Sequence, residues 1–187
     1  TVPEVSPFTG ALGYKIPIVV PPGRNGIAPN LALTYSSQAR NGLAGIGWTI
    51  DLGSIQRNTK YGLDYTNNYG PFPYPFVAAI NGATSYLMYD STWGCFESVV
   101  EGAFSKYCKT DVSTTYSYWT VYAKDGTKYY YGMKEPTASD DGSYRQFDPQ
   151  DPTHIFKWYL TKVEDTNGNY MTVTYAAKDA TNEVYPL

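Results

Sequence analysis

The chain has 187 residues, with 17 acidic and 14 basic side chains, and its charged fraction of 17% lies well below the roughly 25% of ordinary globular domains. The basic residues are scattered, which argues against a nucleic-acid-binding face. No apolar run approaches the roughly 18 residues of a membrane span. Twenty tyrosines and few strong helix formers predict an all-β protein.

The N-terminal segment predicts an arm followed by a strand. Residues 1–11 (TVPEVSPFTGA) have two prolines and no periodicity, which is typical of an extended arm. Residues 12–20 (LGYKIPIVV) alternate in hydrophobicity. The residues expected on one face are Leu12, Tyr14, Ile16, Ile18 and Val20. Pro17 cannot donate a ladder hydrogen bond, so this strand is expected at a sheet edge or with a bulge.

The next segment combines strand patterns with many glycines. Residues 30–36 (NLALTYS) and 48–58 (WTIDLGSIQRN) alternate and predict strands. Between them, SSQARNGLAGIG has glycines that permit positive φ, and we expect a loop that crosses tightly under Trp48. The order G-x-x-G-x-G, with no helix after it, does not match a dinucleotide fingerprint or a phosphate loop.

The middle of the chain is described mainly by composition. Residues 58–83 are rich in Tyr, Asn and Pro and predict an ordered surface loop packed by its own aromatic rings, because disordered segments are poor in aromatics. Cys95 and Cys108 could close a hairpin-sized loop by a disulfide, and two free buried cysteines are the alternative. Low charge, abundant tyrosine and an even cysteine count predict a secreted or cell-surface protein.

Two hairpins are predicted in the second half, where no helical pattern of eight or more residues occurs. YWTVYAKDGTKYYYG and IFKWYLTKVEDTNGNYMTVTYA each hold an Asp-Gly or Asn-Gly pair between β-rich arms. Such pairs favour two-residue type I′ turns, which need φ > 0 at both central residues, with Gly126 and Gly168 as the turn glycines. In the second hairpin this turn places Leu160 opposite Tyr175.

Several aromatic residues are candidates for an interface. Tyr118, Tyr122 and Tyr130 are expected to share the strand face opposite Trp119. Tyrosine buries a large area at a small cost in conformational entropy, so such a face could stack on sugars or bind protein. The alternative, which we favour, is burial on both sides within the layers of a larger assembly.

No motif indicates catalysis. The chain has one histidine, His154, and no serine in a G-x-S-x-G context. Asp148 and Asp151 could serve glycoside hydrolysis as a pair, but nothing marks a perturbed pKa. The Cys and His spacings match no zinc pattern, and the Asp-rich turns do not fit an EF-hand loop. We therefore expect no enzyme activity, no metal and no cofactor.

Four stretches together resemble a known family. TGALGYKIPIVVPPGRNG, APNLALTYSS, NGLAGIGW and WYLTKVEDTNGNYMTVTY resemble the SpvB-type N-terminal module of bacterial insecticidal toxin-complex B components and of Rhs/YD-repeat proteins. Residues 58–112 match no segment of that family that we can identify. The resemblance implies a structural module that adds strands to a large hollow β shell around a toxic polypeptide.

The sequence thus predicts a single all-β module over residues 1–187, built of antiparallel hairpins as a β-sandwich or an open section of an Rhs-like shell. The predicted partners are other modules of a larger protein or copies of the same chain. One alternative is an extracellular carbohydrate- or surface-binding module. Another is a self-assembling filament or surface-layer subunit that uses the N-terminal arm for strand addition.

Overall fold

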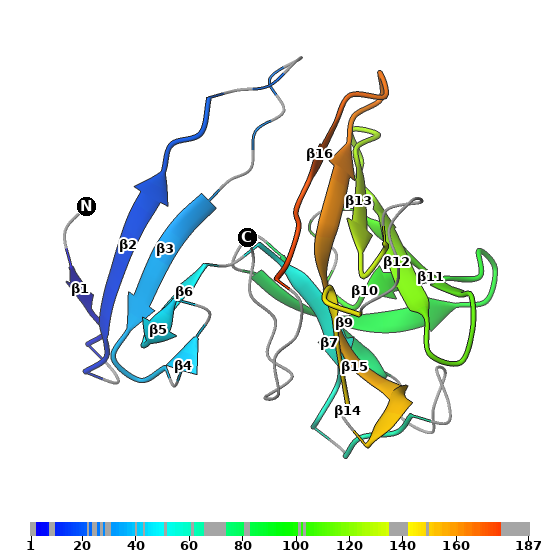
Figure 1. Cartoon of the computed structure of the whole chain (residues 1–187), viewed down its shortest axis with the longest axis horizontal. Helices are drawn as coiled ribbons and strands as arrows, with labels where there is room; N and C mark the ends of the chain where they lie inside the picture. The colour runs from blue at the N-terminus through cyan, green and yellow to red at the C-terminus, as the bar shows by residue number, and fades with distance from the viewer. Residues whose placement is uncertain are drawn as a thin grey trace. The chain divides into compact units, whose positions relative to one another are not determined.

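The computed structural model describes residues 3–7, 10–21, 23, 26, 28, 31–39, 41–42, 44–50, 52–60, 62–65, 74–80, 83–100, 102, 104–134, 142–148 and 150–176. The chain divides into two compact units, residues 1–52 and 53–187. Both units are built of antiparallel strands (Figure 1). Among the described residues, no helix is long and apolar enough to cross a membrane.

The first unit is a four-stranded antiparallel sheet with a small hairpin beside it in sequence. The sheet order is β1 (Glu4–Val5), β2 (Leu12–Ile18), β3 (Leu31–Ser36) and β6 (Trp48–Ile50). The hairpin pairs β4 (Asn41–Gly42) with β5 (Gly45–Ile46), within the segment expected to be a loop.

Two features of β2 bear on the sequence predictions. The N-terminal segment is not simply an extended arm, because Glu4 and Val5 pair with Gly13 and Leu12. Strand addition to another chain would have to break this pairing. Beyond Gly13, the described pairings of β2 involve β3 alone, so Pro17 lies where the missing N–H faces an unpaired edge, as predicted.

The second unit contains a closed eight-stranded barrel. Seven consecutive strands form an antiparallel meander: β7 (Ser54–Arg57), β8 (Phe76–Ile80), β9 (Ala83–Asp90), β10 (Cys95–Ser98), β11 (Lys106–Asp111), β12 (Ser117–Tyr122) and β13 (Lys128–Tyr131). The long strand β15 (Asp151–Glu164) pairs with both β7 and β13 and closes the ring (Figure 1). The all-β prediction is confirmed, but this unit is a closed barrel and neither a sandwich nor an open sheet.

Strand β15 is long enough to carry two more strands. β14 (Arg145–Asp148) pairs with its first half, and β16 (Tyr170–Thr172) pairs with its second half. A register shift between Tyr130 and Tyr131 marks a bulge where β13 meets β15. Bulges bend strands and increase their twist, which helps a sheet to close on itself.

Large aromatic side chains fill the middle of the barrel. The ring centroids of Phe76 and Trp119 lie 4.8 Å apart, and those of Trp119 and Trp158 lie 5.9 Å apart, both in edge-to-face geometry. The indole of Trp158 donates to the Ser117 carbonyl at 3.0 Å. Because facing residues of antiparallel strands share a face, the pairing of Trp119 with Tyr131 also turns the Tyr131 ring inward.

The two predicted hairpins exist, but their turns differ from the expected type. Gly126 and Gly168 have φ of 85° and 79°, whereas neither preceding residue has positive φ. Type I′ turns are therefore excluded, and each hairpin has a three-residue loop that ends in a left-handed glycine. The register of the second hairpin consequently shifts by one residue, so Asp165 rather than Thr166 lies opposite Asn169.

The segment 58–83 is not wholly a loop, because β8 begins at Phe76. The described aromatics before it pack on the barrel rather than only on each other. Tyr65 stacks on His154, and the ring of Tyr74 lies 5.9 Å from that of Tyr86. Residues 61, 66–73 and 81–82 of the expected loop lie outside the described residues.

Candidate functional site

The sheet of the first unit has one continuous apolar face. Pairing places Tyr14 opposite Tyr35 and Ile16 opposite Leu33, and Leu33 also faces Ile50 of the next strand. We refer to this surface as the apolar face. Its members are Leu12, Tyr14, Ile16, Ile18, Leu31, Leu33, Tyr35, Trp48 and Ile50.

The apolar face is substantially exposed. Ile16 retains 38% of its accessible surface and Ile18 retains 40%. The other face of the same strands carries Lys15 and Thr34, which face each other. Among the described residues of this unit, Ala32 is the only hydrophobic side chain in the buried core. The first unit therefore displays the amphipathic pattern of a sheet that covers a core without enclosing one of its own.

Aromatic packing organises the far end of the apolar face. The Trp48 ring lies 5.1 Å from the ring of Tyr35. Gly47 has φ of 78°, and a Cβ there would lie 2.6 Å from the Tyr35 ring and 3.0 Å from the Ser36 carbonyl oxygen. The glycine is thus required by close approach, as expected, but the chain passes against Tyr35 and not directly under Trp48.

A buried arginine ties one end of the barrel together. Arg57 is 5% exposed; its Nε donates to the Ile155 carbonyl at 2.9 Å, and its Nη1 donates to the Asp64 carbonyl at 2.8 Å. Its guanidinium lies 5.3 Å from the Phe76 ring centroid. Burial lowers the pKa of Arg57, partly opposed by Tyr65. These hydrogen bonds join β7 to β15 and to the loop after β7, so Arg57 has a structural role.

A second buried cation faces the same interior. The ammonium group of Lys109 forms an ion pair with Asp111, and the lysine side chain is only 7% exposed. Burial lowers the pKa of Lys109, and the hydrogen bond to Asp111 opposes that shift. The sequence reading missed both cations. Their signal was their place among inward-facing residues, since Arg57 follows the buried Ile55 by two positions and Lys109 follows the buried Tyr107 by two positions, which puts each pair on one face of its strand.

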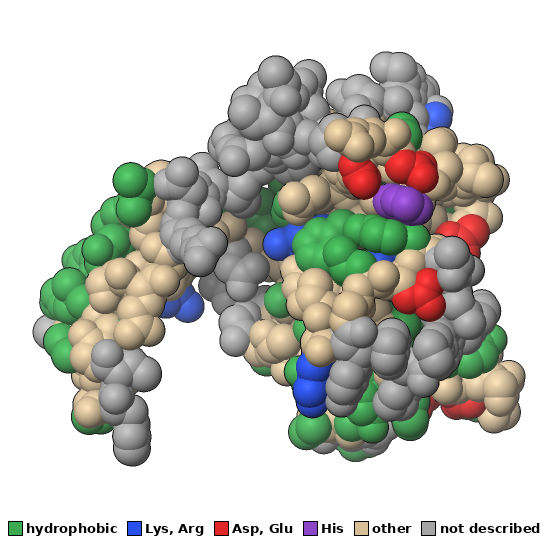
Figure 2. Space-filling view, turned by 90° about the horizontal axis from the view of Figure 1, so that it is seen from below, with side chains coloured by type: hydrophobic (Ala, Val, Ile, Leu, Met, Phe, Trp, Pro, Cys, Tyr) green, Lys and Arg blue, Asp and Glu red, His purple; other side chains and the backbone are tan. Residues whose placement is uncertain are grey.

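The candidate catalytic residues lie where β14 ends and β15 begins. The His154 ring stacks on Tyr65 with centroids 4.3 Å apart, and its Nε2 lies 3.4 Å from Asp151. Figure 2 shows the histidine in purple beside acidic side chains in red and hydrophobic ones in green. Hydrogen bonds from Thr153 lower the pKa of Asp151. A general acid needs a raised carboxyl pKa, so Asp151 has the opposite character. Asp148 lies opposite Asp151, where it accepts the Gln150 N–H within its own turn.

The three candidate interface tyrosines lie on the outside of the barrel. Pairing places Tyr130 opposite Thr120, which puts Tyr118, Tyr122 and Tyr130 on the face opposite Trp119. Tyr122 is 44% exposed. The Lys162 ammonium lies 5.4 Å from the Tyr130 ring centroid, so part of that ring is covered by a cation. The shared face is as expected, although its use in binding stays a prediction.

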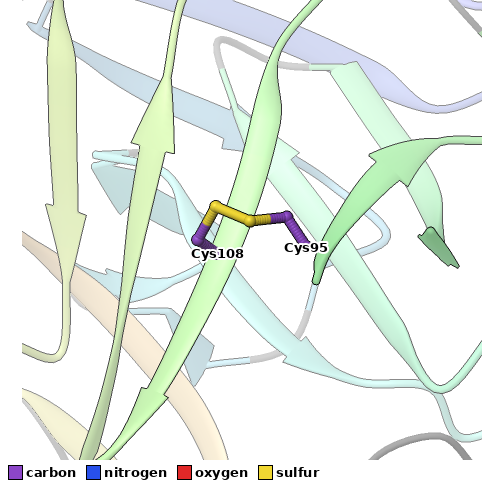
Figure 3. The surroundings of a disulfide bond; sticks show 2 residues. All are labelled: Cys95 and Cys108. Carbon is purple, nitrogen blue, oxygen red and sulfur yellow. A yellow bond between two sulfur atoms is a disulfide. The ribbon is translucent and has the colours of Figure 1, made fainter. Parts of the chain in front are cut away.

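The two cysteines form a disulfide between neighbouring strands (Figure 3). Cys95 begins β10, and Cys108 lies in β11, beside the pair formed by Phe96 and Tyr107. Because the rings of Phe96 and Tyr107 are buried in the barrel, the adjacent cysteines point to the opposite, outer side of the sheet. The bridge fastens two strands of the meander without occupying the interior.

The fold and these surfaces define an all-β module that has an amphipathic sheet and a closed barrel. Comparison with known families gives the particular assignment. The family described as Salmonella virulence plasmid 65kDa B protein matches residues 6–75 and 84–185, and the chain belongs to this family. This confirms the SpvB-type resemblance and extends it to residues 58–75 and 84–112, for which the sequence alone showed no family segment.

Individual relatives share only a modest part of the sequence. The chain is 25% identical over 191 residues to the mono(ADP-ribosyl)transferase SpvB of Salmonella typhimurium, a match that covers 92% of this chain and 31% of the relative. The chain therefore spans about a third of the length of the curated relatives that it matches.

Solved structures share the fold. A Photorhabdus luminescens Tc holotoxin pore structure matches with a TM-score of 0.69 and 23% identity, over 100% of this chain and 9% of that chain. The N-terminal domain of the effector protein SpvB from Salmonella typhimurium strain LT2 matches with a TM-score of 0.60 and 20% identity, over 87% of this chain and 58% of that chain.

Proposed function

We propose that this chain is a non-catalytic structural module of a secreted, SpvB-like or toxin-complex-like protein, in which it contributes strands to a larger assembly. The observation that carries the proposal is the apolar face of the first unit, where Ile16 and Ile18 remain 38% and 40% exposed on a sheet without a core of its own. A sheet with one apolar face gains stability by burying that face against another layer.

The relatives support the same reading. The chain covers 31% of the SpvB relatives and 9% of the chain in the Tc holotoxin pore, so modules of this fold occur there within much longer polypeptides. The occupant that we propose for the apolar face is another module of such a polypeptide. Secretion is proposed on the same basis, together with the disulfide between Cys95 and Cys108, which persists in oxidising compartments.

The test compares lysine substitutions on the two faces of the sheet. Ile16→Lys places a charge in the apolar face, whereas Thr34→Lys places the same charge on the polar face of the neighbouring strand. The wild-type chain should bind a hydrophobic dye such as anilinonaphthalene sulfonate and should self-associate at high concentration in light scattering. Ile16→Lys should reduce both signals, and Thr34→Lys should leave both unchanged.

A wild-type chain that binds no dye and stays monomeric would contradict the proposal, because its apolar face would then be satisfied within the chain itself. Equal effects of the two lysine variants would also contradict the proposal. Such a result would mean that the added charge, and not the loss of the apolar face, reduces dye binding and self-association. Circular dichroism of both variants shows whether the sheet is retained.

A further inference from the structure

The barrel interior is not filled along its whole length. A cavity of about 490 Å³ opens at one end of the barrel. It is lined by residues of β8, β9, β11, β12 and β13 and of the connections next to them. Five of its lining residues have very small side chains, namely Ala78, Ala83, Ser85, Ser105 and Ala123.

The cavity results from a gradient of side-chain size along neighbouring strands. On β8 the inward residue changes from Phe76 to Ala78, and on β9 it changes from Leu87 to Ser85. On β12 and just after it the series runs from Trp119 through Val121 to Ala123. Eight-stranded barrels have interiors that side chains can fill or that can hold one small ligand. Here large rings seal one part of the interior, and small residues leave the other part open.

The inner lining of the cavity is uncharged and mainly apolar. Its walls include Ala78, Val121 and the rings of Tyr107 and Tyr129. Burial raises the pKa of Tyr107 and of Tyr129, so both phenols keep their protons at neutral pH. The serine and tyrosine hydroxyls are the polar groups of the inner lining. The charged members of the lining, Lys124 and Asp125, belong to the turn between β12 and β13 and have opposite signs.

The aromatic ring of Phe104 lies near the open end of the cavity. Phe104 precedes the lining residue Ser105, has φ of 50° and leaves 64% of its surface exposed. Its ring lies 5.3 Å from the ammonium group of Lys124, which also lines the cavity. Residues other than glycine rarely adopt the left-handed region, because their Cβ comes too close to the backbone there. This conformation and exposure are unfavourable for a phenylalanine that only connects two strands.

We propose that this cavity is a binding site for an uncharged aromatic amphiphile of one or two rings. Its volume lies within the range of about 300–1,000 Å³ that is typical of small-molecule sites. The ring would pack on Ala78, Val121 and Tyr129, and its hydroxyl or carbonyl group would hydrogen-bond to Ser85 or Ser105. A charged ligand would lose its hydration in the inner cavity without gaining a counter-ion.

The test titrates 1-naphthol into the chain and follows the fluorescence of the probe. Ser85→Leu fills the cavity, and Thr84→Leu introduces the same side chain at the preceding residue of β9, which points to the exposed outer side. Wild type and Thr84→Leu should show saturable binding of one probe per chain with similar affinity. Ser85→Leu should bind about tenfold more weakly or worse, which is a loss of about 1.4 kcal/mol or more.

Non-saturable binding to wild type, or equal binding by Ser85→Leu, would overturn the proposal. If Ser85→Leu fails to fold by circular dichroism, Ala83→Leu at the mouth replaces it with the same expected loss. Naphthalene-1-sulfonate tests the ligand class, because its charge should weaken binding by about tenfold or more. Equal affinity for the sulfonate would contradict the uncharged class. None of these results depends on the apolar face of the first unit.

Discussion

Replacing Cys95 and Cys108 together by serine should lower the free energy of unfolding by about 3 kcal/mol. The bridge joins residues 13 positions apart. In the chain-entropy model, opening a loop of this size returns about 3 kcal/mol of conformational freedom to the unfolded state at 25 °C. The Cα atoms are 4.5 Å apart, the normal spacing of a non-hydrogen-bonded antiparallel pair, so the native strands need not move when the bond is removed.

The assay is urea unfolding followed by tryptophan fluorescence, which reports on the barrel because Trp119 and Trp158 are fully buried there. Thermal unfolding gives a second measurement. For a chain of this size, a loss of 1 kcal/mol lowers the melting temperature by about 2–4 °C, so the variant should melt about 6–12 °C below wild type. A reductant should lower the wild-type midpoint to that of the double serine variant, which should not respond. A loss below about 1 kcal/mol, or a wild type that is insensitive to reductant, would refute the entropic reasoning.

Three further predictions concern the barrel. Gly132→Ala should destabilise the barrel by about 2 kcal/mol or more in urea unfolding, because the new Cβ would lie 2.4 Å from the Trp158 ring. Gly168 has a similar φ but open space around it, so Gly168→Ala is the matched control. Arg57→Lys should cost about 1–3 kcal/mol in urea unfolding, since an ammonium group cannot reproduce the fork that reaches two carbonyls from two elements; an unchanged midpoint would contradict this role. Burial raises the pKa of Tyr175 far above its ordinary value of 10.0, so the folded state holds a proton that the unfolded state releases, and stability should fall as the pH rises above about 10. Tyr175→Phe should flatten this alkaline loss in melting temperature, and an unchanged slope would exclude Tyr175 as its source.

The local elements of the first unit were largely predictable from sequence. Alternation in residues 12–20 and 30–36 predicted two strands, which the structure has at Leu12–Ile18 and Leu31–Ser36. The apolar face that they share follows from their pairing. The pairing of Glu4 with Gly13 could not be predicted, because the two prolines of the N-terminal segment hide a two-residue strand.

The closure of the barrel was not predictable, because it depends on pairs that are distant in sequence. Ser54 pairs with Tyr159, and no local pattern specifies that partner. Strand β9 was not predicted for a different reason. Its outward residues Tyr86 and Met88 are large and hydrophobic like the inward Leu87, so the alternation that normally reveals a half-buried strand is weak.

The turn type was wrong for a physical reason. Asp125 Oδ1 accepts the N–H of Thr127, and Asp165 Oδ1 accepts the N–H of Asn167. These side-chain hydrogen bonds favour loops in which the glycine alone adopts positive φ. Asp125 stands directly before Gly126 and Asp165 three positions before Gly168, so these aspartates were as informative as the glycines. The cavity was missed because its small inward residues become meaningful only once the barrel register is known.

The most direct test of the structural role is the chemical accessibility of the apolar face. With both native cysteines bonded, a cysteine introduced in place of Ile16 provides a unique thiol. Its rate of reaction with a maleimide can be compared with those of Val19→Cys, at a position 91% exposed, and Val121→Cys, at a position 2% exposed. We predict that the reaction rate of Ile16→Cys lies within about tenfold of that of Val19→Cys, because the apolar face is exposed until another module covers it. A rate as slow as that of Val121→Cys would contradict the account.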